Sequence, residues 1–292
     1  MSLTIVAKCK DSDKHAEDVE FVTEWPFGGN FYSGGDDGKL KIWNRDLTLK
    51  HSQKLHEYRV YHAAFTHDSI YTCSNSPFIK EWTHLGPDGL VPKRQLEGHE
   101  DSVRKLRIGR TKLVSGGDDG QVRMWYTETG KCEAFMPVIE EVWDLKVDGD
   151  FIFTVRDRGI SIWQTCEADQ RSQHCGTLEA RAPIALTPNT IYGLDKETST
   201  KILGFKRGGQ WEQIITIEAS DRIIKAIALR DDVIYSGGYD KTLKAWDRKT
   251  NQLLASCEME AEVSAIAAVG KSHVLVGLQG GSLVLLDFKK TA

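Results

Sequence analysis

The sequence repeats itself at a period of about 40 residues, and this periodicity is the feature that most limits the folds open to the chain. Four copies align without gaps on a terminal Trp, and three weaker copies follow the same pattern. In chain order, the seven copies end at Trp43, Trp82, Trp125, Trp163, Phe205, Trp246 and Leu286. Together they account for nearly all of the 292 residues. We therefore expect seven similar units and no room in this sequence for a separate catalytic domain.

Each copy contains the signal of a β-hairpin. In the first one, an apolar run ends in a Gly/Asp turn, which the alternating sequence Leu40-Lys41-Ile42-Trp43 follows. Another short apolar segment precedes each hairpin, and a fourth follows the first six hairpins. Four strands in about 40 residues is the repeat of one propeller blade. The pattern thus predicts an all-β fold, a seven-bladed β-propeller of four-stranded antiparallel blades.

The predicted blades form a single propeller domain over residues 1–292, with the following borders. Blades one to seven are expected at about 10–57, 58–97, 98–137, 138–179, 180–219, 220–259 and 260–292. The seventh copy ends before a fourth strand, whereas residues 1–9 hold a spare one, from Leu3 to Cys9. We expect this segment to pair as the outer strand of blade seven and close the ring, because it would cover a bare edge.

The repeats resemble the WD40-repeat family. The likeness rests on the Ser-Gly-Gly-x-Asp turn followed six residues later by Trp, on Gly98-His99 before Val103, and on Trp246-Asp247. The family builds a buried hydrogen-bond network from a His, a Ser or Thr, the turn Asp and the Trp. The resemblance implies such structural networks at His15, Ser33, Asp37 and Trp43, at His99, Ser115, Asp119 and Trp125, and in part at Ser236, Asp240 and Trp246. Their repetition in separate copies favours a role in the scaffold over one in catalysis.

The resemblance also implies where partners bind, on the top face around the first strand of each blade and before the turn Asp. Carried over position by position, the expected partner-binding residues are Arg59, Tyr61, Arg104, Asp118, Trp143, Arg156, Lys225 and Tyr239. Arginine and aromatic side chains are enriched in the hot spots of protein interfaces. Blades two to four should form an Arg/aromatic sector that faces acidic residues of blades seven and one. Such a sector fits a peptide with a negatively charged or aromatic anchor.

Charge and hydropathy exclude several classes of protein. The net charge of −4 provides no global attraction to nucleic acid or to an anionic membrane. No apolar window approaches the roughly 18 residues of a transmembrane helix, and the first twenty residues do not resemble a signal peptide. The six cysteines are scattered without a CxxC pair, which is typical of a reducing compartment. We therefore expect a protein of the cytoplasm or nucleus.

Candidate catalytic and metal motifs fail on their spacing. His56 and His99 each precede a Glu, as in the zinc-protease motif, but a Val stands where the second His is required. The Asp pairs at 36–37 and 118–119 suit tight turns better than a calcium loop. No nucleophile elbow and no phosphate-binding loop is found. The sequence thus predicts no enzyme activity, no catalytic residue, no metal and no cofactor.

The leading interpretation is a non-catalytic scaffold that binds peptide segments of partner proteins, as a monomeric subunit of a hetero-complex. One alternative is a substrate receptor of a cullin-type ubiquitin ligase, because Trp246 to Lys249 resembles the Trp-Asp-x-Arg/Lys box of such receptors. An alternative of another class is a hydrolase or an enzyme subunit that uses the central channel. That would need several inward carboxylates or His, whereas the first strands are mostly Val, Ile, Leu and Ala. RNA binding by the Arg/aromatic sector is disfavoured by the acidic net charge.

Overall fold

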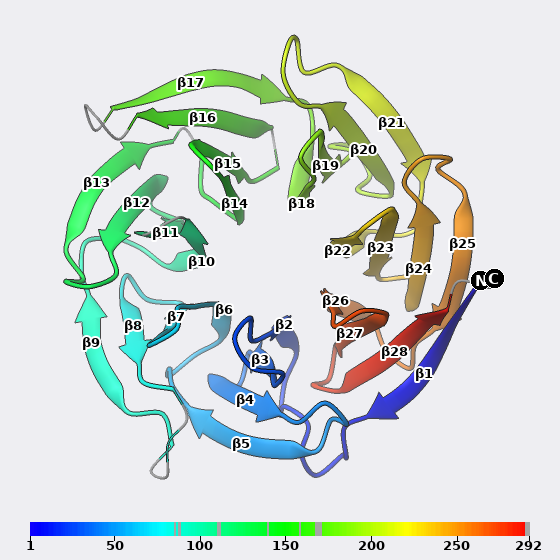
Figure 1. Ribbon diagram of the computed structural model, residues 1–292, viewed down its shortest axis with the longest axis horizontal. Coiled ribbons are helices and arrows are strands. Elements are labelled where there is room, and N and C mark those ends of the chain that lie inside the picture. Colours follow the sequence, from blue (N-terminus) through cyan, green and yellow to red (C-terminus); the bar gives the residue numbers. More distant parts are fainter. Residues whose placement is uncertain are drawn as a thin grey trace. The chain divides into compact units, whose positions relative to one another are not determined.

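A computed structural model describes residues 1–84, 86, 89–109, 112–138, 140–157, 159–166 and 171–289. Over these residues the regular secondary structure consists of strands, which form seven four-stranded antiparallel sheets, and the predicted fold class is confirmed (Figure 1). In the same part of the chain no helix is long and apolar enough to cross a membrane. The chain divides into two compact units, unit 1 with Met1–Arg59 and Ala185–Ala292, and unit 2 with Val60–Ile184.

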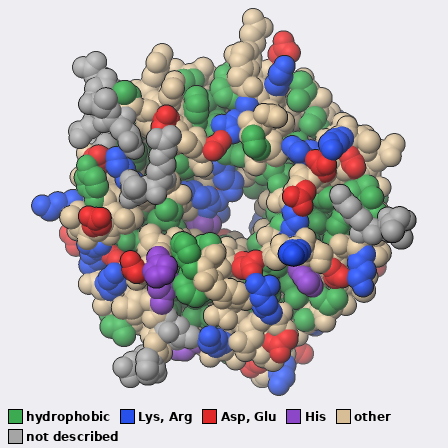
Figure 2. Space-filling view, viewed as in Figure 1, with side chains coloured by type: hydrophobic (Ala, Val, Ile, Leu, Met, Phe, Trp, Pro, Cys, Tyr) green, Lys and Arg blue, Asp and Glu red, His purple; other side chains and the backbone are tan. Residues whose placement is uncertain are grey.

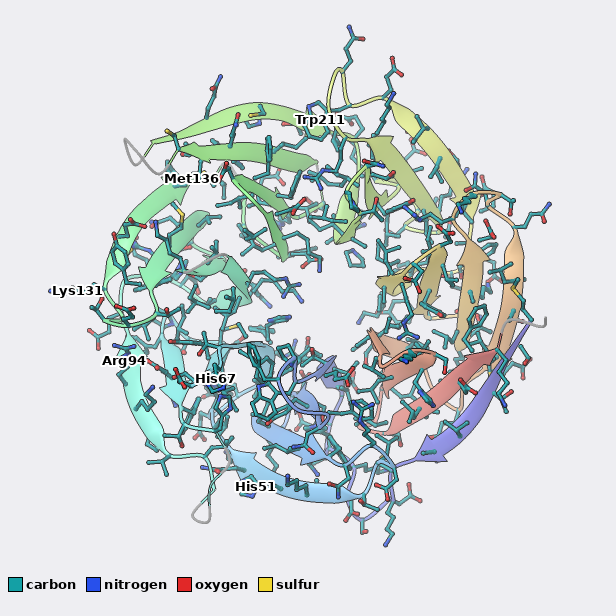
Figure 3. All side chains as sticks on the ribbon, in the orientation of Figure 1. His51, His67, Arg94, Lys131, Met136 and Trp211 are labelled. Carbon is teal, nitrogen blue, oxygen red and sulfur yellow. The ribbon has the colours of Figure 1, made fainter. Side chains whose placement is uncertain are left out.

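Unit 2 contains three sheets whose strands follow one another in chain order. The strands are β6 (Val60–Phe65), β7 (Ile70–Ser74), β8 (Ile79–Trp82) and β9 (Pro92–Leu96); β10 (Val103–Gly109), β11 (Lys112–Gly117), β12 (Gln121–Tyr126) and β13 (Cys132–Pro137); and β14 (Asp144–Asp148), β15 (Phe151–Val155), β16 (Ile160–Cys166) and β17 (Arg171–Leu178). Apolar side chains are buried between neighbouring sheets, for example those of Val103 and Leu106. On β9, Arg94 reaches the next sheet and donates to the backbone carbonyls of Thr127 and Glu128 (Figure 3). The sheets of unit 2 are thus joined by both apolar packing and polar contacts.

Unit 1 contains the other four sheets. Their strands are β2 (Val19–Glu24), β3 (Phe31–Gly35), β4 (Lys39–Trp43) and β5 (Leu49–Lys54); β18 (Arg181–Leu186, which starts in unit 2), β19 (Thr190–Leu194), β20 (Lys201–Lys206) and β21 (Gln213–Glu218); β22 (Ile224–Arg230), β23 (Val233–Gly238), β24 (Thr242–Asp247) and β25 (Leu253–Glu258); and β26 (Val263–Val269), β27 (His273–Leu278), β28 (Leu283–Lys289) and β1 (Ser2–Lys8). The turn between β3 and β4 needs glycine at Gly38, because its φ is +73° and a Cβ would lie 2.3 Å from the His56 carbonyl oxygen. The Gly/Asp signal of the repeat therefore has a steric cause.

The N-terminal strand completes the sheet of the last repeat, as predicted. β1 runs antiparallel to β28, with pairs from Ser2 and Lys289 to Lys8 and Val284 (Figure 1). Beyond the strand, the Cys9 N–H donates to the Leu283 carbonyl at 3.0 Å. Segments from the beginning and from near the end of the sequence thereby lie in one sheet.

Candidate partner-binding site

A buried hydrogen-bond network holds the first sheet in place. The His15 imidazole lies 3.0 Å through Nδ1 from Asp37 Oδ1 and 2.7 Å through Nε2 from Ser33 Oγ. The Trp43 indole donates to Ser33 Oγ at 2.9 Å. A neutral His15 with its proton on Nδ1 satisfies every partner, since Ser33 then donates to Nε2 and accepts from Trp43.

Ionisation supports this proton arrangement. Burial lowers the pKa of His15, which favours the neutral ring. Burial alone would raise the pKa of Asp37, but hydrogen bonds from His15 and from backbone N–H groups outweigh it and lower the pKa to about 2. The network is therefore an ionised carboxylate that orients a neutral imidazole.

The third repeat places the same residue types in the same geometry. His99 lies 2.7 Å from Asp119 Oδ2 and 2.7 Å from Ser115 Oγ, and Trp125 donates to Ser115 at 2.8 Å. In both networks the buried polar groups have hydrogen-bond partners, and this makes the sheets more rigid.

The sixth repeat varies the network. Trp246 donates to Ser236 at 2.9 Å, whereas Asp240 accepts hydrogen bonds from Ser220 at 2.9 Å and from Lys244 at 2.8 Å. In the absence of a His, a serine and a lysine satisfy the turn carboxylate.

Sequence reasoning missed one further member of this class. In the second repeat, Trp82 donates to Thr72 Oγ1 at 2.8 Å. The signal was available, because Thr72 stands ten residues before its Trp, as Ser33 does before Trp43.

Arg104, one of the residues expected to bind partners, is held by an ion pair and by a ring contact. Its Nε lies 2.8 Å from both carboxylate oxygens of Asp118, and Nη2 lies 2.6 Å from Oδ2. The guanidinium carbon sits 4.3 Å from the ring centroid of Tyr61. The three predicted residues thus form one composite group in unit 2, which we call the Arg104 clamp.

Trp143 and Arg156 form a second group in unit 2. The Arg156 guanidinium carbon lies 5.0 Å from the Trp143 ring centroid. Glu141 joins both side chains, since its carboxylate lies 3.3 Å from Arg156 Nη1 and accepts from the Trp143 indole at 3.2 Å. We call these three residues the Trp143 clamp.

The predicted residues of unit 1 form two separate groups. The Lys225 ammonium lies 5.3 Å from the ring centroid of Tyr239. Arg59 lies 2.7 Å from Asp36 Oδ2 and 3.4 Å from Glu20 Oε1. Burial, together with the neighbouring Glu20, raises the pKa of Asp36 to about 7. The acidic residues of the first repeat are therefore direct ion partners of Arg59.

The arginines of the predicted sector are already paired with carboxylates. On the face shown in Figure 2, blue Lys and Arg side chains are interspersed with red Asp and Glu. Pairing fixes each cation in one geometry and neutralises much of its charge. The groups are therefore suited to stacking and directional hydrogen bonds more than to long-range attraction of an anion.

A second set of ionisable residues was not predicted. The first strands of the three unit 2 sheets bring together His62, Lys105, Arg107, Asp144 and Lys146. Two alternate-residue pairs, 105 with 107 and 144 with 146, give the signal in the sequence, because alternate residues of a strand share a face. Among the described residues, no group of three or more His, Cys, Asp and Glu is arranged to hold a metal ion.

The chain shares sequence and fold with known proteins. Residues 8–44 and 90–126 match the family model of the WD domain, G-beta repeat. The WD40 β-propeller domain of Doa1 superposes with a TM-score of 0.83 at 17% identity, over 99% of this chain and 98% of that one.

Similar sequences come from several eukaryotes. Nuclear distribution protein nudF of Aspergillus niger is 26% identical over 271 residues, which is 80% of this chain and 60% of the relative. Zinc finger CCCH domain-containing protein 62 of Arabidopsis thaliana is 24% identical over 186 residues, or 61% and 43%. TSET complex member tstF of Dictyostelium discoideum is 30% identical over 149 residues, or 44% and 13%. The chain thus spans less than two thirds of these relatives. The two matched repeats, the seven four-stranded sheets and the superposed propeller together show WD40 repeats and a β-propeller fold in this chain.

Proposed function

We propose that this protein is a non-catalytic interaction scaffold that binds a peptide segment of a partner protein through the Arg104 and Trp143 clamps. The observation that carries the proposal is the geometry of Arg104, which Asp118 holds at 2.6 to 2.8 Å while Tyr61 covers one face of the guanidinium. A side chain that is ordered before binding loses little conformational entropy when a partner arrives.

The exposure of the clamps supports the same role. The side chains of Arg104 and Arg156 keep 29% and 34% of their surface exposed although both are paired and stacked. Such amphipathic, half-buried side chains are the kind that dominate interface energetics. Among the relatives, the name of tstF describes a member of a complex, which accords with a scaffold role for this chain.

The charge of the clamps supports one of the two anchors expected from the sequence. Asp118 and Glu141 already offset the charges of Arg104 and Arg156. A further carboxylate would have to compete with them, whereas an aromatic side chain would stack beside Tyr61 or Trp143 without displacing either ion pair. We therefore favour a peptide with an aromatic anchor.

The experiment is recovery of cross-linked partners from cells that express the wild-type protein or the variant Arg104→Glu/Trp143→Ala. The proposal expects loss of a defined set of partners. The matched control is Arg222→Glu/Trp211→Ala, which removes the same residue types outside the clamps. Circular dichroism establishes that all three proteins are folded. Unchanged partners in the clamp variant would overturn the proposal.

The ubiquitin-ligase alternative stays a prediction. Arg248 and Lys249 both pair with Asp232, at 3.0 and 2.7 Å. Recovery of a cullin complex in the same experiment would support that alternative.

A further inference from the structure

A cationic cluster lies on the first strands of the three unit 2 sheets, apart from the two clamps. It consists of His62 on β6, Lys105 and Arg107 on β10, and Asp144 and Lys146 on β14. On β10 and β14 the charged residues are two positions apart, so both members of each pair point to the same side of the strand. Neighbouring strands thus direct their ionisable side chains into one space.

Three of the four sheets of unit 1 show that the fold does not require charge at these positions. Aligned on the first strand, the equivalent residues are Phe21 and Thr23, Ala226 and Ala228, and Ala265 and Ala267. Unit 2 instead has ionisable residues at five of the six positions, with Ala64 as the exception. The side chains of Arg107 and Lys146 are only 22% and 27% exposed, and partly buried charges are unfavourable unless they are paired, so a structural role explains them poorly.

Asp144 organises the cluster from one side. Its carboxylate accepts hydrogen bonds from the backbone N–H groups of Leu145 and Ile184, both at 2.9 Å. Arg107 Nη2 lies 3.5 Å from Asp144 Oδ1, and Arg107 Nη1 donates to His62 Nε2 at 2.6 Å. Burial and the neighbouring cations lower the pKa of His62 well below its usual range, so the ring stays neutral and accepts this hydrogen bond.

The two lysines are much less well satisfied. Lys146 Nζ lies 3.9 Å from Asp144 Oδ2, too far for a hydrogen bond. Within the described residues, the Lys105 ammonium makes no hydrogen bond and no ion pair, although it lies close enough to perturb His62, Asp144 and Lys146. Three cationic side chains therefore face a single carboxylate, and two ammonium groups keep donors to offer.

We propose that the cationic cluster is a binding site for a small phosphate-class anion, held by Lys105, Arg107 and Lys146. A dianion accepts hydrogen bonds from the unsatisfied ammonium groups and offsets the excess positive charge, while Asp144 keeps Arg107 in position. The neutral His62 adds no repulsion or attraction of its own. This proposal is independent of the peptide-binding function.

The protonation of Lys146 supplies a signature of binding. Burial, followed by Arg107 and Lys105, lowers the pKa of Lys146 to about 7, and Asp144 opposes this shift only in part. The groups that face Lys146 are Asp144 on its own strand and Lys105 and Arg107 on β10, with His62 beyond them on β6. An anion bound among them raises the pKa of Lys146, so binding at about pH 8 takes up protons from the buffer.

The experiment is titration calorimetry of the full chain with sodium pyrophosphate at constant ionic strength, at about pH 8, in two buffers that differ in ionisation enthalpy. Wild type should bind and take up protons. Lys105→Met/Lys146→Met should bind roughly tenfold or more weakly, without proton uptake, because two charge-assisted hydrogen bonds are lost. The matched control Lys50→Met/Lys131→Met removes two exposed lysines and should match wild type.

Two further arms identify the source of the phosphate. Inorganic phosphate should bind more weakly than pyrophosphate through the same residues. A phosphoserine peptide should bind with the same affinity as free phosphoserine. Equal pyrophosphate binding by the cluster and control variants, or no binding to wild type, would overturn the proposal. Cluster-dependent binding of the peptide alone would also overturn it, in favour of a phosphorylated partner.

Discussion

The pairing of β1 with β28 predicts that stability depends on one N-terminal side chain. Leu3 is only 8% exposed and packs in a cluster that includes Leu286 and Phe288 of β28. Replacing a buried Leu by Ala removes its transfer free energy and leaves a cavity, together about 3 kcal/mol. We therefore expect Leu3→Ala to lower the free energy of unfolding by about 3 kcal/mol.

The expected shift in Tm follows from the size of the chain. Unfolding entropy is about 2 cal/mol/K per residue, so 292 residues that unfold together convert 3 kcal/mol into about 5 °C. Differential scanning calorimetry measures both Tm and the number of transitions. Val6→Ala is the matched control, since Val6 lies on the same strand and is 52% exposed. Its Tm should change by less than about 1 °C.

Deletion of residues 1–9 should have a larger effect, because it also removes the ladder to β28 and the buried Cys9. The reasoning would be refuted if Leu3→Ala were no more destabilising than Val6→Ala. A deletion variant with an unchanged Tm would likewise show that the pairing of β1 contributes nothing to stability.

Three further predictions concern buried polar groups. Ser115→Ala should lower the free energy of unfolding by about 1 to 3 kcal/mol in urea denaturation, since it leaves Trp125 and its His partner without the shared hydroxyl. The pKa of Asp37 in the folded protein is about 2, below its ordinary value of 3.8, so ionised Asp37 contributes roughly 2 kcal/mol to the free energy of unfolding. This contribution is present above pH 3.8 and is lost as the pH falls through 2. Asp37→Asn should therefore make the free energy of unfolding less dependent on pH in that range. Glu81→Leu should lower the free energy of unfolding by about 3 kcal/mol in thermal unfolding, because it leaves the Arg94 cation and two other partners of the buried carboxylate without their acceptor. A variant as stable as wild type would count against that network.

Much of the fold was predictable because the same pattern of apolar residues and turn residues occurs seven times in the sequence. Three features of the sequence indicate which strands pair through backbone hydrogen bonds. They are the Gly/Asp turns, the alternating third strands and the spare N-terminal segment. The full networks of the first and third repeats were implied by the resemblance to the WD40 family, whose network residues match this sequence by position. The hydrogen bond from Trp82 to Thr72 was not predicted because the second repeat lacks the Ser-Gly-Gly-x-Asp turn. The spacing of ten residues between Thr72 and Trp82 is nevertheless preserved.

The cationic cluster was missed for a different reason. Its members come from three repeats, and no spacing within one repeat shows that His62, Lys105 and Asp144 lie near one another. The first strands were expected to be mostly Val, Ile, Leu and Ala, whereas five of the six alternating positions compared in unit 2 are ionisable. Ion-pair partners were equally hidden, since the pairing of Arg104 with Asp118 depends on side-chain direction in the folded hairpin.

Side-chain direction on the first strands has a visible backbone cause. On β10 the register with β11 shifts between Val103 and Lys105, so a β-bulge lies at Arg104. A bulge leaves one residue outside the ladder and redirects its side chain. Arg104 accordingly turns to Asp118, whereas Lys105 and Arg107, after the bulge, take the alternating positions that lead to the cluster.

The same bulge recurs on β6, β2, β22 and β26, where it lies at Tyr61, Glu20, Lys225 and Ser264. It is thus a feature of the repeat, and it separates two sets of positions on each first strand. Bulge residues can vary to suit a partner without disturbing the ladder, and the alternating positions after them can vary independently. One strand such as β10 therefore contributes to two groups of different net charge, a neutralised clamp and a cationic cluster, because the backbone determines the direction of each side chain.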